Sequence, residues 1–310
     1  MSYELSKNIL ATVTYYDVLN WPLSGFEVWK HLISQERQGH QNGACLVPSS
    51  LSDVMACLRS EHLTHKLEEQ NGFYFLPGRA ELISKRIHAE KLSALKLKRM
   101  KALARLLAFV PYVRMIGATG SLAMKKGSAG SDWDMFVVLQ AGKMWIGRTL
   151  LTGFLHIIGK RRHGEKINDR ACLNYFVTDD NLEIGTKDLF SAHEYRFLIP
   201  LVGLSVFRKF ELKNAWIREY KPNFFPTTLA HSFALPESAA VVKVQEALES
   251  FFDLFDLEKR LSRWQKEKIS RNPNTKVEGS LIEASDRALI FLPHPRGPQV
   301  FEKFKQRLSA

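Results

Sequence analysis

Residues 117–139 read GATGSLAMKKGSAGSDWDMFVVL, and this stretch decides the fold of the region around it. It closes on the apolar run 135–139, which is typical of a buried strand. Asp132 and Asp134 stand one residue apart at the mouth of that strand. Because side chains alternate along a strand, we expect both carboxylates on one face and Trp133 on the other. Two like charges held together against a core repel each other, so we expect them to hold a cation between them.

A Gly-Ser pair is separated from Asp132 by ten residues. Gly120 lets the backbone approach an anion closely, and Ser121 adds a hydroxyl where a short turn enters a helix. The apolar stretch 112–117 before the pair is expected to be another buried strand. Polar and basic residues of the spacer are expected to lie over the same anion; they include Lys125, Lys126, Ser128 and Ser131.

Gly-Ser, the spacer and Asp-Trp-Asp before an apolar strand together resemble the signature of the DNA polymerase β-type nucleotidyltransferase superfamily. The likeness covers residues 110–200, and small bacterial nucleotidyltransferase-domain proteins share the pattern. It implies a mixed α/β sheet with flanking helices, and transfer of a nucleoside monophosphate from a nucleoside triphosphate, ATP above all, to a hydroxyl group. Asp132 and Asp134 would be the catalytic ligands of Mg²⁺ or Mn²⁺. The residues implied in nucleotide binding are Gly120, Ser121, Lys125 and Ser131.

The chain departs from the family pattern at one position. Members of this superfamily supply a third carboxylate from a later, neighbouring strand, where it completes the metal site and can accept a proton. The matching strand here is ACLNYFV, residues 171–177, with Asn174 at its centre. An amide oxygen can contact a metal but cannot act as the base. Asp169, just before this strand, and Asp179 or Asp180, just after it, are candidates for the missing group.

Two functions therefore stay open. In the first, the chain is an Mg²⁺-dependent enzyme whose acceptor is a protein, an RNA or a small molecule. In the second, the domain is catalytically degenerate, and the protein is a nucleic-acid-binding or regulatory module. Lys and Arg total 44 against 32 Asp and Glu, a formal net charge of +12, which favours polyanionic partners. The same excess weakens the case for a cationic drug as the acceptor.

Residues 1–78 have the pattern of a winged helix-turn-helix-like domain. Three apolar helical stripes precede two strand-like runs around Asn71-Gly72, a strong hairpin signal. Ser24 and Glu27 have capping-box spacing at the start of the second helix. The third helix, within SSLSDVMACLRSEH (49–62), has one arginine and two acidic residues, too little positive charge for a DNA groove. A structural or protein-binding use is therefore favoured over DNA readout.

Residues 79–109 contain neither Pro nor Gly and predict one long basic helix. This helix is either a linker with a solvated face or a cationic wall beside a phosphate site. The nucleotidyltransferase domain is predicted over 110–222, and a mainly helical C-terminal region over 223–310.

Within the predicted domain, residues 143–163 and 191–203 are expected to be helices and 170–180 a strand. The domain is expected to end at KPNFFP, 221–226. His193 and Glu194 are assigned a capping or packing role, because His-Glu without a second histidine is not a zinc motif.

The length of 310 residues favours two or three domains. No apolar run approaches the roughly 20 residues of a membrane helix, and no signal peptide is visible, so we expect a cytoplasmic protein without a membrane partner. The three cysteines lack metal-ligand spacing and are expected to be reduced.

Overall fold

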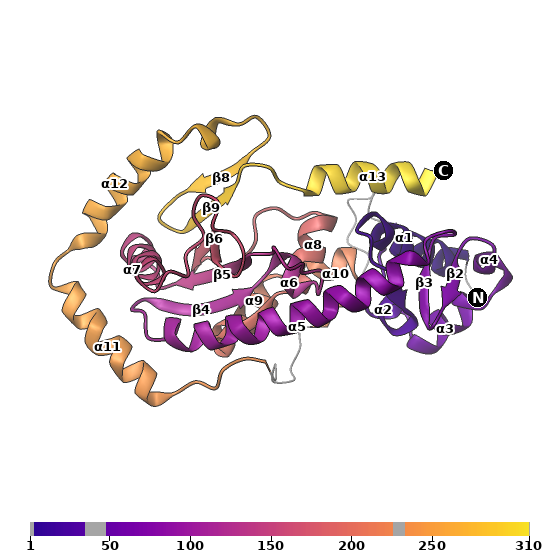
Figure 1. Ribbon diagram of the computed structural model, residues 1–310, viewed down its shortest axis with the longest axis horizontal. Helices are drawn as coiled ribbons and strands as arrows, with labels where there is room; N and C mark the ends of the chain where they lie inside the picture. The colour runs from indigo at the N-terminus through magenta and orange to yellow at the C-terminus, as the bar shows by residue number, and fades with distance from the viewer. Residues whose placement is uncertain (1–2, 35–47, 226–232, 310) are drawn as a thin grey trace.

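The computed structural model describes residues 3–34, 48–225 and 233–309. Figure 1 shows a small N-terminal unit joined through the long helix α5 to a larger unit built on a six-stranded sheet. The predicted mixed α/β class is confirmed. Cys45, one of the three cysteines, and the last residue of the predicted 221–226 boundary lie outside the described residues.

The N-terminal unit packs helices against a three-stranded antiparallel sheet of order β1-β3-β2. Asn71 and Gly72 both have positive φ, so the β2–β3 turn has the hairpin geometry that Asn-Gly predicts. Ser24 and Glu27 form the predicted capping box at the start of α2. The elements of this unit are α1 (Tyr3–Val18), β1 (Leu23–Ser24), α2 (Gly25–Lys30), α3 (Leu51–Leu58), α4 (Glu61–Thr64), β2 (Glu68–Gln70) and β3 (Phe73–Phe75).

Helix α5 (Glu81–Leu107) is the long helix predicted for residues 79–109. Its apolar face is buried against the large unit, and most of its basic residues are exposed. Arg86 is an exception, since it is buried and pairs with Glu27 of α2 at 2.7 Å. No residue of α5 lines the large cavity described below. The basic residues of α5 therefore do not form a wall of this cavity.

The central sheet has the strand order β7-β4-β5-β6-β9-β8. Strands β5 and β6 are parallel, and all other neighbouring pairs are antiparallel. Helix α7 (Met144–Ile157) makes the crossover that a parallel pair requires. The strands are β4 (Val113–Ala118), β5 (Trp133–Leu139), β6 (Ala171–Thr178), β7 (Ile199–Val202), β8 (Leu281–Ala284) and β9 (Ala288–Leu292).

Alternation along β5 separates two hydrophobic cores, one on each face of the sheet. Trp133 and Val137 belong to the core shared with α5 and α7. Phe136 and Val138 belong to the core on the opposite face, which is shared with α8 (Leu189–Arg196), α9 (Leu204–Lys213) and α10 (Ile217–Tyr220). The same alternation places Asp134 on the face of Phe136 and Val138.

The helix predicted over residues 191–203 is wrong in its second half. Helix α8 ends at Arg196, and Ile199–Val202 forms strand β7, which pairs antiparallel with β4. Pro200 lacks an N–H and is tolerated because β7 is an edge strand. A short apolar run does not by itself distinguish a strand from a helix.

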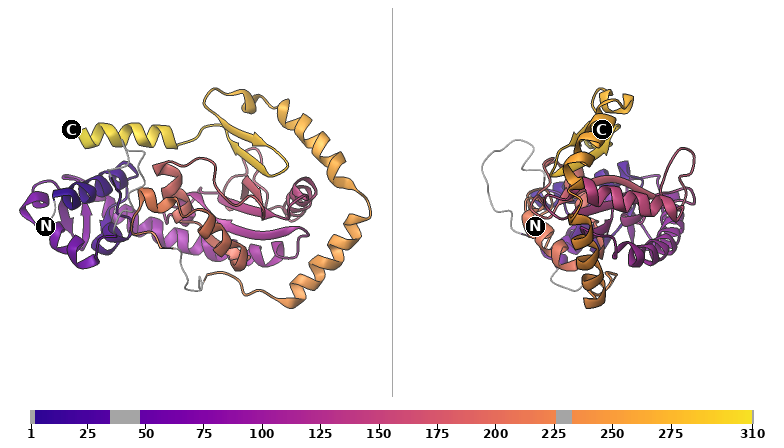
Figure 2. Two further views of the ribbon diagram at one scale, coloured as in Figure 1. Left: turned by 180° about the vertical axis from the view of Figure 1, so that it is seen from behind. Right: turned by 90° about the vertical axis from the view of Figure 1, so that its left-hand side faces the viewer.

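The region after residue 222 is mainly helical, as predicted, but it is not a separate layer. Strand β9 pairs with β6 and extends the central sheet, while α13 returns to the N-terminal unit. The views in Figure 2 show α13 lying alongside that unit. Phe304 is fully buried there, with its ring 5.4 Å from that of Tyr15. The helical elements of this region are α11 (Ala239–Asp253), α12 (Leu257–Ser270), η2 (Pro273–Lys276) and α13 (Gly297–Ser309).

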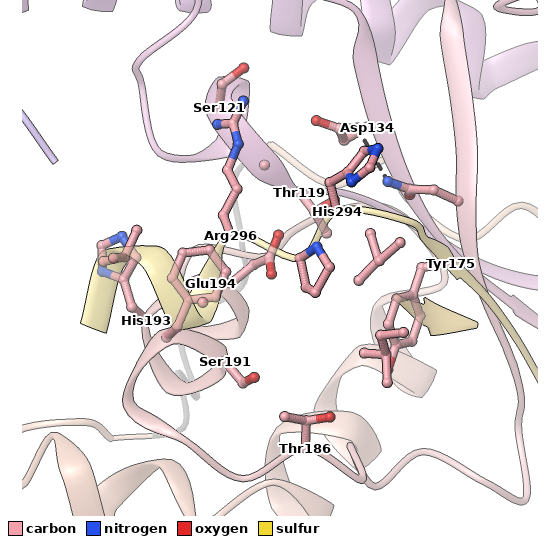
Figure 3. A pocket seen from close by; sticks show the side chains of 18 of the residues that line it. Thr119, Ser121, Asp134, Tyr175, Thr186, Ser191, His193, Glu194, His294 and Arg296 are labelled. Carbon is pink, nitrogen blue, oxygen red and sulfur yellow. Dashed lines mark hydrogen bonds between the residues drawn. The ribbon is translucent and has the colours of Figure 1, made fainter. Parts of the chain in front are cut away.

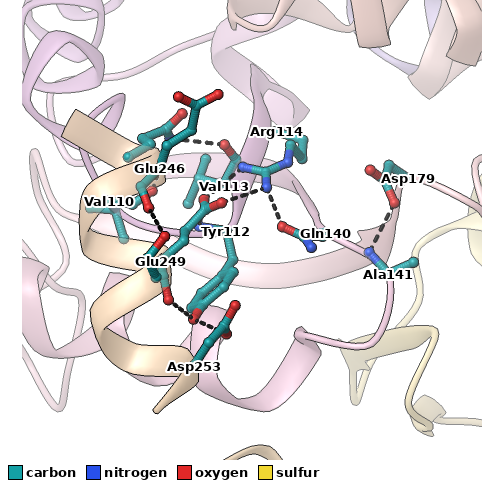
Figure 4. Close-up of polar contacts among 12 residues, drawn as sticks. Val110, Tyr112, Val113, Arg114, Gln140, Ala141, Asp179, Glu246, Glu249 and Asp253 are labelled. Atoms are coloured by element: carbon teal, nitrogen blue, oxygen red, sulfur yellow. Dashed lines mark hydrogen bonds and ion pairs between the residues drawn. The ribbon is translucent and has the colours of Figure 1, made fainter. Parts of the chain in front are cut away.

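Polar contacts hold α11 against the start of β4 (Figure 4). Glu249 accepts hydrogen bonds from the Arg114 guanidinium at 2.8 and 2.9 Å and from the Tyr112 backbone N–H at 2.6 Å. Asp253 accepts a further one from the Tyr112 hydroxyl at 2.7 Å. Within the described ranges, no helix has both the length and the apolar character needed to cross a membrane.

Candidate functional site

The two aspartates face a cavity of about 1060 Å³ where three parts of the chain meet. One wall comes from the sheet and the Gly-Ser turn, and another from α8. The segment 293–298, which follows β9 and includes the first two residues of α13, contributes a third. Figure 3 shows side chains from these walls pointing into the same space. The cavity is therefore assembled from residues distant in sequence.

Asp132 and Asp134 converge as the strand pattern predicts. A ligand atom of each, together with Sγ of Cys172, lies within 4.8 Å of the other two. Cys172 comes close because β5 and β6 pair with Asp134 opposite Cys172. Trp133, between the aspartates, is buried in the core on the other face. Burial raises the pKa of Asp134 to about 6, and the negative charge of Asp132 adds to the effect.

The Gly-Ser turn lies directly against Asp134. Gly120 has φ of +63°, and a Cβ added there would meet Oδ2 of Asp134 at 2.2 Å. The backbone N–H of Thr119 also donates to the carbonyl of Asp134 at 3.0 Å. Helix α6 (Gly120–Ala123) starts at this point. Only glycine can bring the turn this close to the carboxylate.

Arg162 balances part of the negative charge. Its Nη1 lies 2.5 Å from Oδ2 of Asp132 and 3.4 Å from Sγ of Cys172. The Arg162 side chain is 42% exposed, whereas that of Asp132 is 16% exposed. The guanidinium can therefore move into solvent without unfolding any element.

The third carboxylate is not where the sequence suggested it. Asp169 forms ion pairs with Lys96 at 3.1 Å and Arg99 at 2.8 Å, and it does not line the cavity. Asp179 and Asp180 follow β6 at the opposite end from Cys172, where they contact Ala141 and Arg287. Among the described residues, no third carboxylate belongs to the group formed by the aspartates and the thiol.

Asn174 does lie beside the aspartates. It lines the cavity, and its Nδ2 is 3.5 Å from Oδ1 of Asp134. Cys172, two residues earlier on β6, was not identified from the sequence. The period-two alternation that placed Asn174 would also have found it. Burial, with the neighbouring aspartates, raises the pKa of the Cys172 thiol to about 12, so the thiol stays protonated.

Lys96 fixes the approach to the aspartates from outside the cavity. This buried ammonium donates to the carbonyls of Ala129 and Ser131 at 2.7 and 2.8 Å and to Oδ1 of Asn168 at 2.8 Å. It thereby joins the loop before β5 to the loop before β6. Ser131, predicted to bind nucleotide, lines the cavity.

The spacer lysines have different environments. Lys125 was predicted to bind nucleotide, but it is exposed and does not line the cavity. Lys126, the next residue, does line it. Burial lowers the pKa of Lys126 to about 7, and the positive charge of Arg296 lowers it further. Ser128 is exposed and contacts Ser131.

Glu194 also belongs to the cavity, contrary to the packing role expected from the sequence. Burial raises its pKa to about 7, with Asp134 contributing a smaller part. His193 lines the same cavity, but it is buried and its Nδ1 contacts the hydroxyl of Tyr16 at 3.2 Å, as a packing role requires. Neither Glu194 nor Arg296 carries a local sequence signal, because each reaches the cavity only through tertiary folding.

Comparisons with family models, curated proteins and solved structures produced no match to this chain.

Proposed function

We propose that the protein is a metal-dependent nucleotidyltransferase that moves a nucleoside monophosphate from a nucleoside triphosphate to a hydroxyl group. The observation that carries this proposal is the convergence of Asp132 and Asp134 against the backbone of Gly120. Two carboxylates on one face bind cations, and a glycine turn beside them accepts an anion. Together they could bind both the cation and the anion of a metal–phosphate substrate.

The donor set fits a hard divalent cation such as Mg²⁺ or Mn²⁺. Asp132 and Asp134 would hold it through carboxylate oxygens, and the neutral thiol of Cys172 is a weak ligand for such ions. A bound divalent cation would neutralise charge on the transferred phosphate and the leaving pyrophosphate. Arg162 now neutralises Asp132, and it must withdraw before that carboxylate can serve as a ligand.

Glu194 is the group we propose as acceptor of the hydroxyl proton. It lines the same cavity, and its pKa of about 7 suits a general base at neutral pH. Asn174 cannot take this role, and Asp169 is engaged with Lys96 and Arg99. Glu194 would thus replace the carboxylate that β6 lacks.

The N-terminal unit supports a winged-helix interpretation with a use other than DNA readout. Its element order and its β1-β3-β2 sheet match that arrangement. On α3, Leu51, Ser52 and Asp53 are exposed, and none of them is basic. A protein acceptor or partner suits this face better than a phosphate backbone does.

Incubation of the protein with each radiolabelled nucleoside triphosphate, Mg²⁺ and whole-cell lysate tests the proposal. We expect label on a macromolecule or small product, with pyrophosphate release. Asp132→Asn and Asp134→Asn keep the side-chain shape and should abolish both signals, while Asp180→Asn, outside the cavity, should not. Transfer that survives in both cavity variants would refute the assignment.

A second candidate function is a degenerate domain in a nucleic-acid-binding or regulatory protein. It is favoured by the Arg162–Asp132 ion pair and by the absence of a third carboxylate from the cluster within the described part of the chain. An internal cation in place of a metal is one way to stabilise such a site without catalysis. Tight polynucleotide binding that persists in Asp132→Asn and Asp134→Asn, without transfer in the wild type, would select this function.

A further inference from the structure

Two cationic side chains face the cavity beside the aspartates, and they come from parts of the chain that are distant in sequence. Lys126 follows the Gly-Ser turn, and Arg296 lies in the segment 293–298. Figure 3 shows the Arg296 side chain directed into the cavity, as is that of Glu194. The Gly-Ser turn, which was predicted to bind nucleotide, therefore shares the cavity with a cation from the C-terminal region.

Among the described residues, neither cation forms an ion pair with a carboxylate. Within the described ranges, no hydrogen bond or ion pair involves the ammonium of Lys126 or the guanidinium of Arg296, and Lys126 lies only over the ring of Trp21, 5.8 Å from its centroid. Arg162 and Lys96 differ, since each contacts a carboxylate. A charged group that faces a cavity without a partner is satisfied most readily by a ligand of opposite charge.

The electrostatics of the cavity agree with this geometry. Arg296 acts on three cavity groups. Its positive charge adds to the lowering of the Lys126 pKa by burial, and it partly offsets the rise that burial causes in the pKa values of Asp134 and Glu194. Arg296 and Lys126 repel each other in the free protein, and an anion between them removes that cost. The carboxylates of Asp134 and Glu194 line the same cavity and repel an anion. We therefore expect an anion whose charge is distributed over several groups, as in a polyphosphate, or is partly neutralised by a bound cation.

We propose that Lys126 and Arg296 form a subsite for the polyphosphate tail of a nucleotide, with the segment 293–298 supplying half of it. This inference rests on the proposed function for the identity of the ligand as a nucleotide. A short polyphosphate fits better than a nucleic-acid backbone, because the cations lie inside a cavity walled by three parts of the chain and not along an open groove.

Binding at this subsite is coupled to the position of the C-terminal region. Arg296 immediately precedes α13, whose Phe304 is buried in the N-terminal core. A ligand that binds only when the segment 293–298 is in place stabilises that placement. Polyphosphate should therefore protect α13 and the segment before it from hydrogen exchange.

The test is binding of Mg²⁺–tripolyphosphate, measured by calorimetry on the full chain. Arg296→Ala and Lys126→Ala should each weaken binding about tenfold or more, because each removes a charge-assisted contact. Arg296→Lys keeps the charge and should lose less. Arg260→Ala and Lys243→Ala are the controls, since both residues are exposed, lie on α12 and α11 and do not line the cavity. Both should bind as the wild type does.

The subsite is overturned if the wild type does not bind tripolyphosphate, or if the cavity variants bind as tightly as the controls. It is also overturned if Arg296→Ala weakens binding of a single-stranded oligonucleotide but not of tripolyphosphate. Circular dichroism melts establish that each variant is folded. Nucleotide transfer with unchanged binding in Arg296→Ala removes this inference alone, whereas Arg296-dependent binding without any transfer removes only the enzymatic proposal.

Discussion

Gly120 shows how one residue can set the distance between a turn and a carboxylate. Its positive φ and the 2.2 Å separation that an added Cβ would have from Asp134 leave no room for a side chain. We expect Gly120→Ala to lower the free energy of unfolding by about 1–3 kcal/mol. It should also weaken Mn²⁺ binding, because Asp134 has to move away from the turn. Denaturant unfolding and Mn²⁺ titration measure the two effects.

Gly130→Ala is the matched control for that substitution. Gly130 lies in the same spacer, has no positive φ, and has no atom within 4 Å of an added Cβ. Its effect on stability should stay within about 0.5 kcal/mol. Equal losses in the two variants would show that the close approach at Gly120 has no special role.

Glu194 predicts a pH dependence of stability. Its pKa rises from 4.5 to about 7 on folding, chiefly through burial, so the folded protein holds the proton more tightly than the unfolded chain. The resulting stabilisation is complete below pH 4.5 and is lost as the pH rises through 7. Glu194→Gln stays neutral, and above this window it should be more stable than the wild type by about 1–2 kcal/mol, allowing for solvent screening.

The rate of nucleotide transfer should increase over the pH range in which the stability decreases. If Glu194 accepts the hydroxyl proton, transfer by the wild type increases as the pH rises through about 7, and Glu194→Gln is slow at every pH. Thermal melts and initial rates across the same buffers separate the two effects. A variant that is stabilised but keeps the wild-type rate profile would show that Glu194 is not the base.

For single residues, the sequence predicts only the contacts between positions that are close along the chain. Asp132, Asp134 and Gly120 lie in one short stretch, so strand alternation and glycine geometry were enough to bring them together. Glu194 and Arg296 could not be predicted in this way, because helix α8 and the segment 293–298 reach the cavity through packing alone. Asp169 was misplaced because the buried charge of Lys96 draws it toward α5.

One buried side chain of helix α5 connects the loop before β5 to the loop before β6. Lys96 joins the residue before Asp132 to the loop before β6. Lys96→Met leaves three oxygen acceptors without their donor, and Asp169 keeps only its ion pair with Arg99. We expect a loss of about 3 kcal/mol in unfolding free energy and weaker Mn²⁺ binding. Lys98→Met, on the exposed side of the same helix, should change neither. Equal effects in both variants would contradict this role.

The elements themselves were predicted well where the pattern was long. Residues 79–109 contain no Pro or Gly to interrupt the 27-residue helix α5, and Asn71-Gly72 specifies a turn by its own backbone preference. Strand β7 was missed because its four residues gain their hydrogen bonds from β4, which the local sequence does not reveal. Strand β9 likewise gains its hydrogen bonds from β6 and β8 from β9, so the local sequence did not reveal that these strands join the sheet.

Helix α13 packs against helix α1 of the N-terminal unit. Phe304 of α13 is fully buried among residues of the N-terminal core, and Arg307 pairs with Asp17 of α1. Phe304→Ala should cost about 3–5 kcal/mol, and it should lower hydrogen-exchange protection in α1 and the segment 293–298 together. Gln306→Ala, on the exposed side of α13, should leave both unchanged. Loss of protection confined to α13 would show that the two units are not coupled.

Strand β9 lies between two other strands, and the Phe304 side chain lies within the first core of the chain. During translation the ribosome synthesises both after the strands and helices on which they pack. Until they arrive, one sheet has an open edge and one core lacks an aromatic ring, and such surfaces invite aggregation. The nascent chain should therefore depend on chaperones until residues 281–304 have left the exit tunnel.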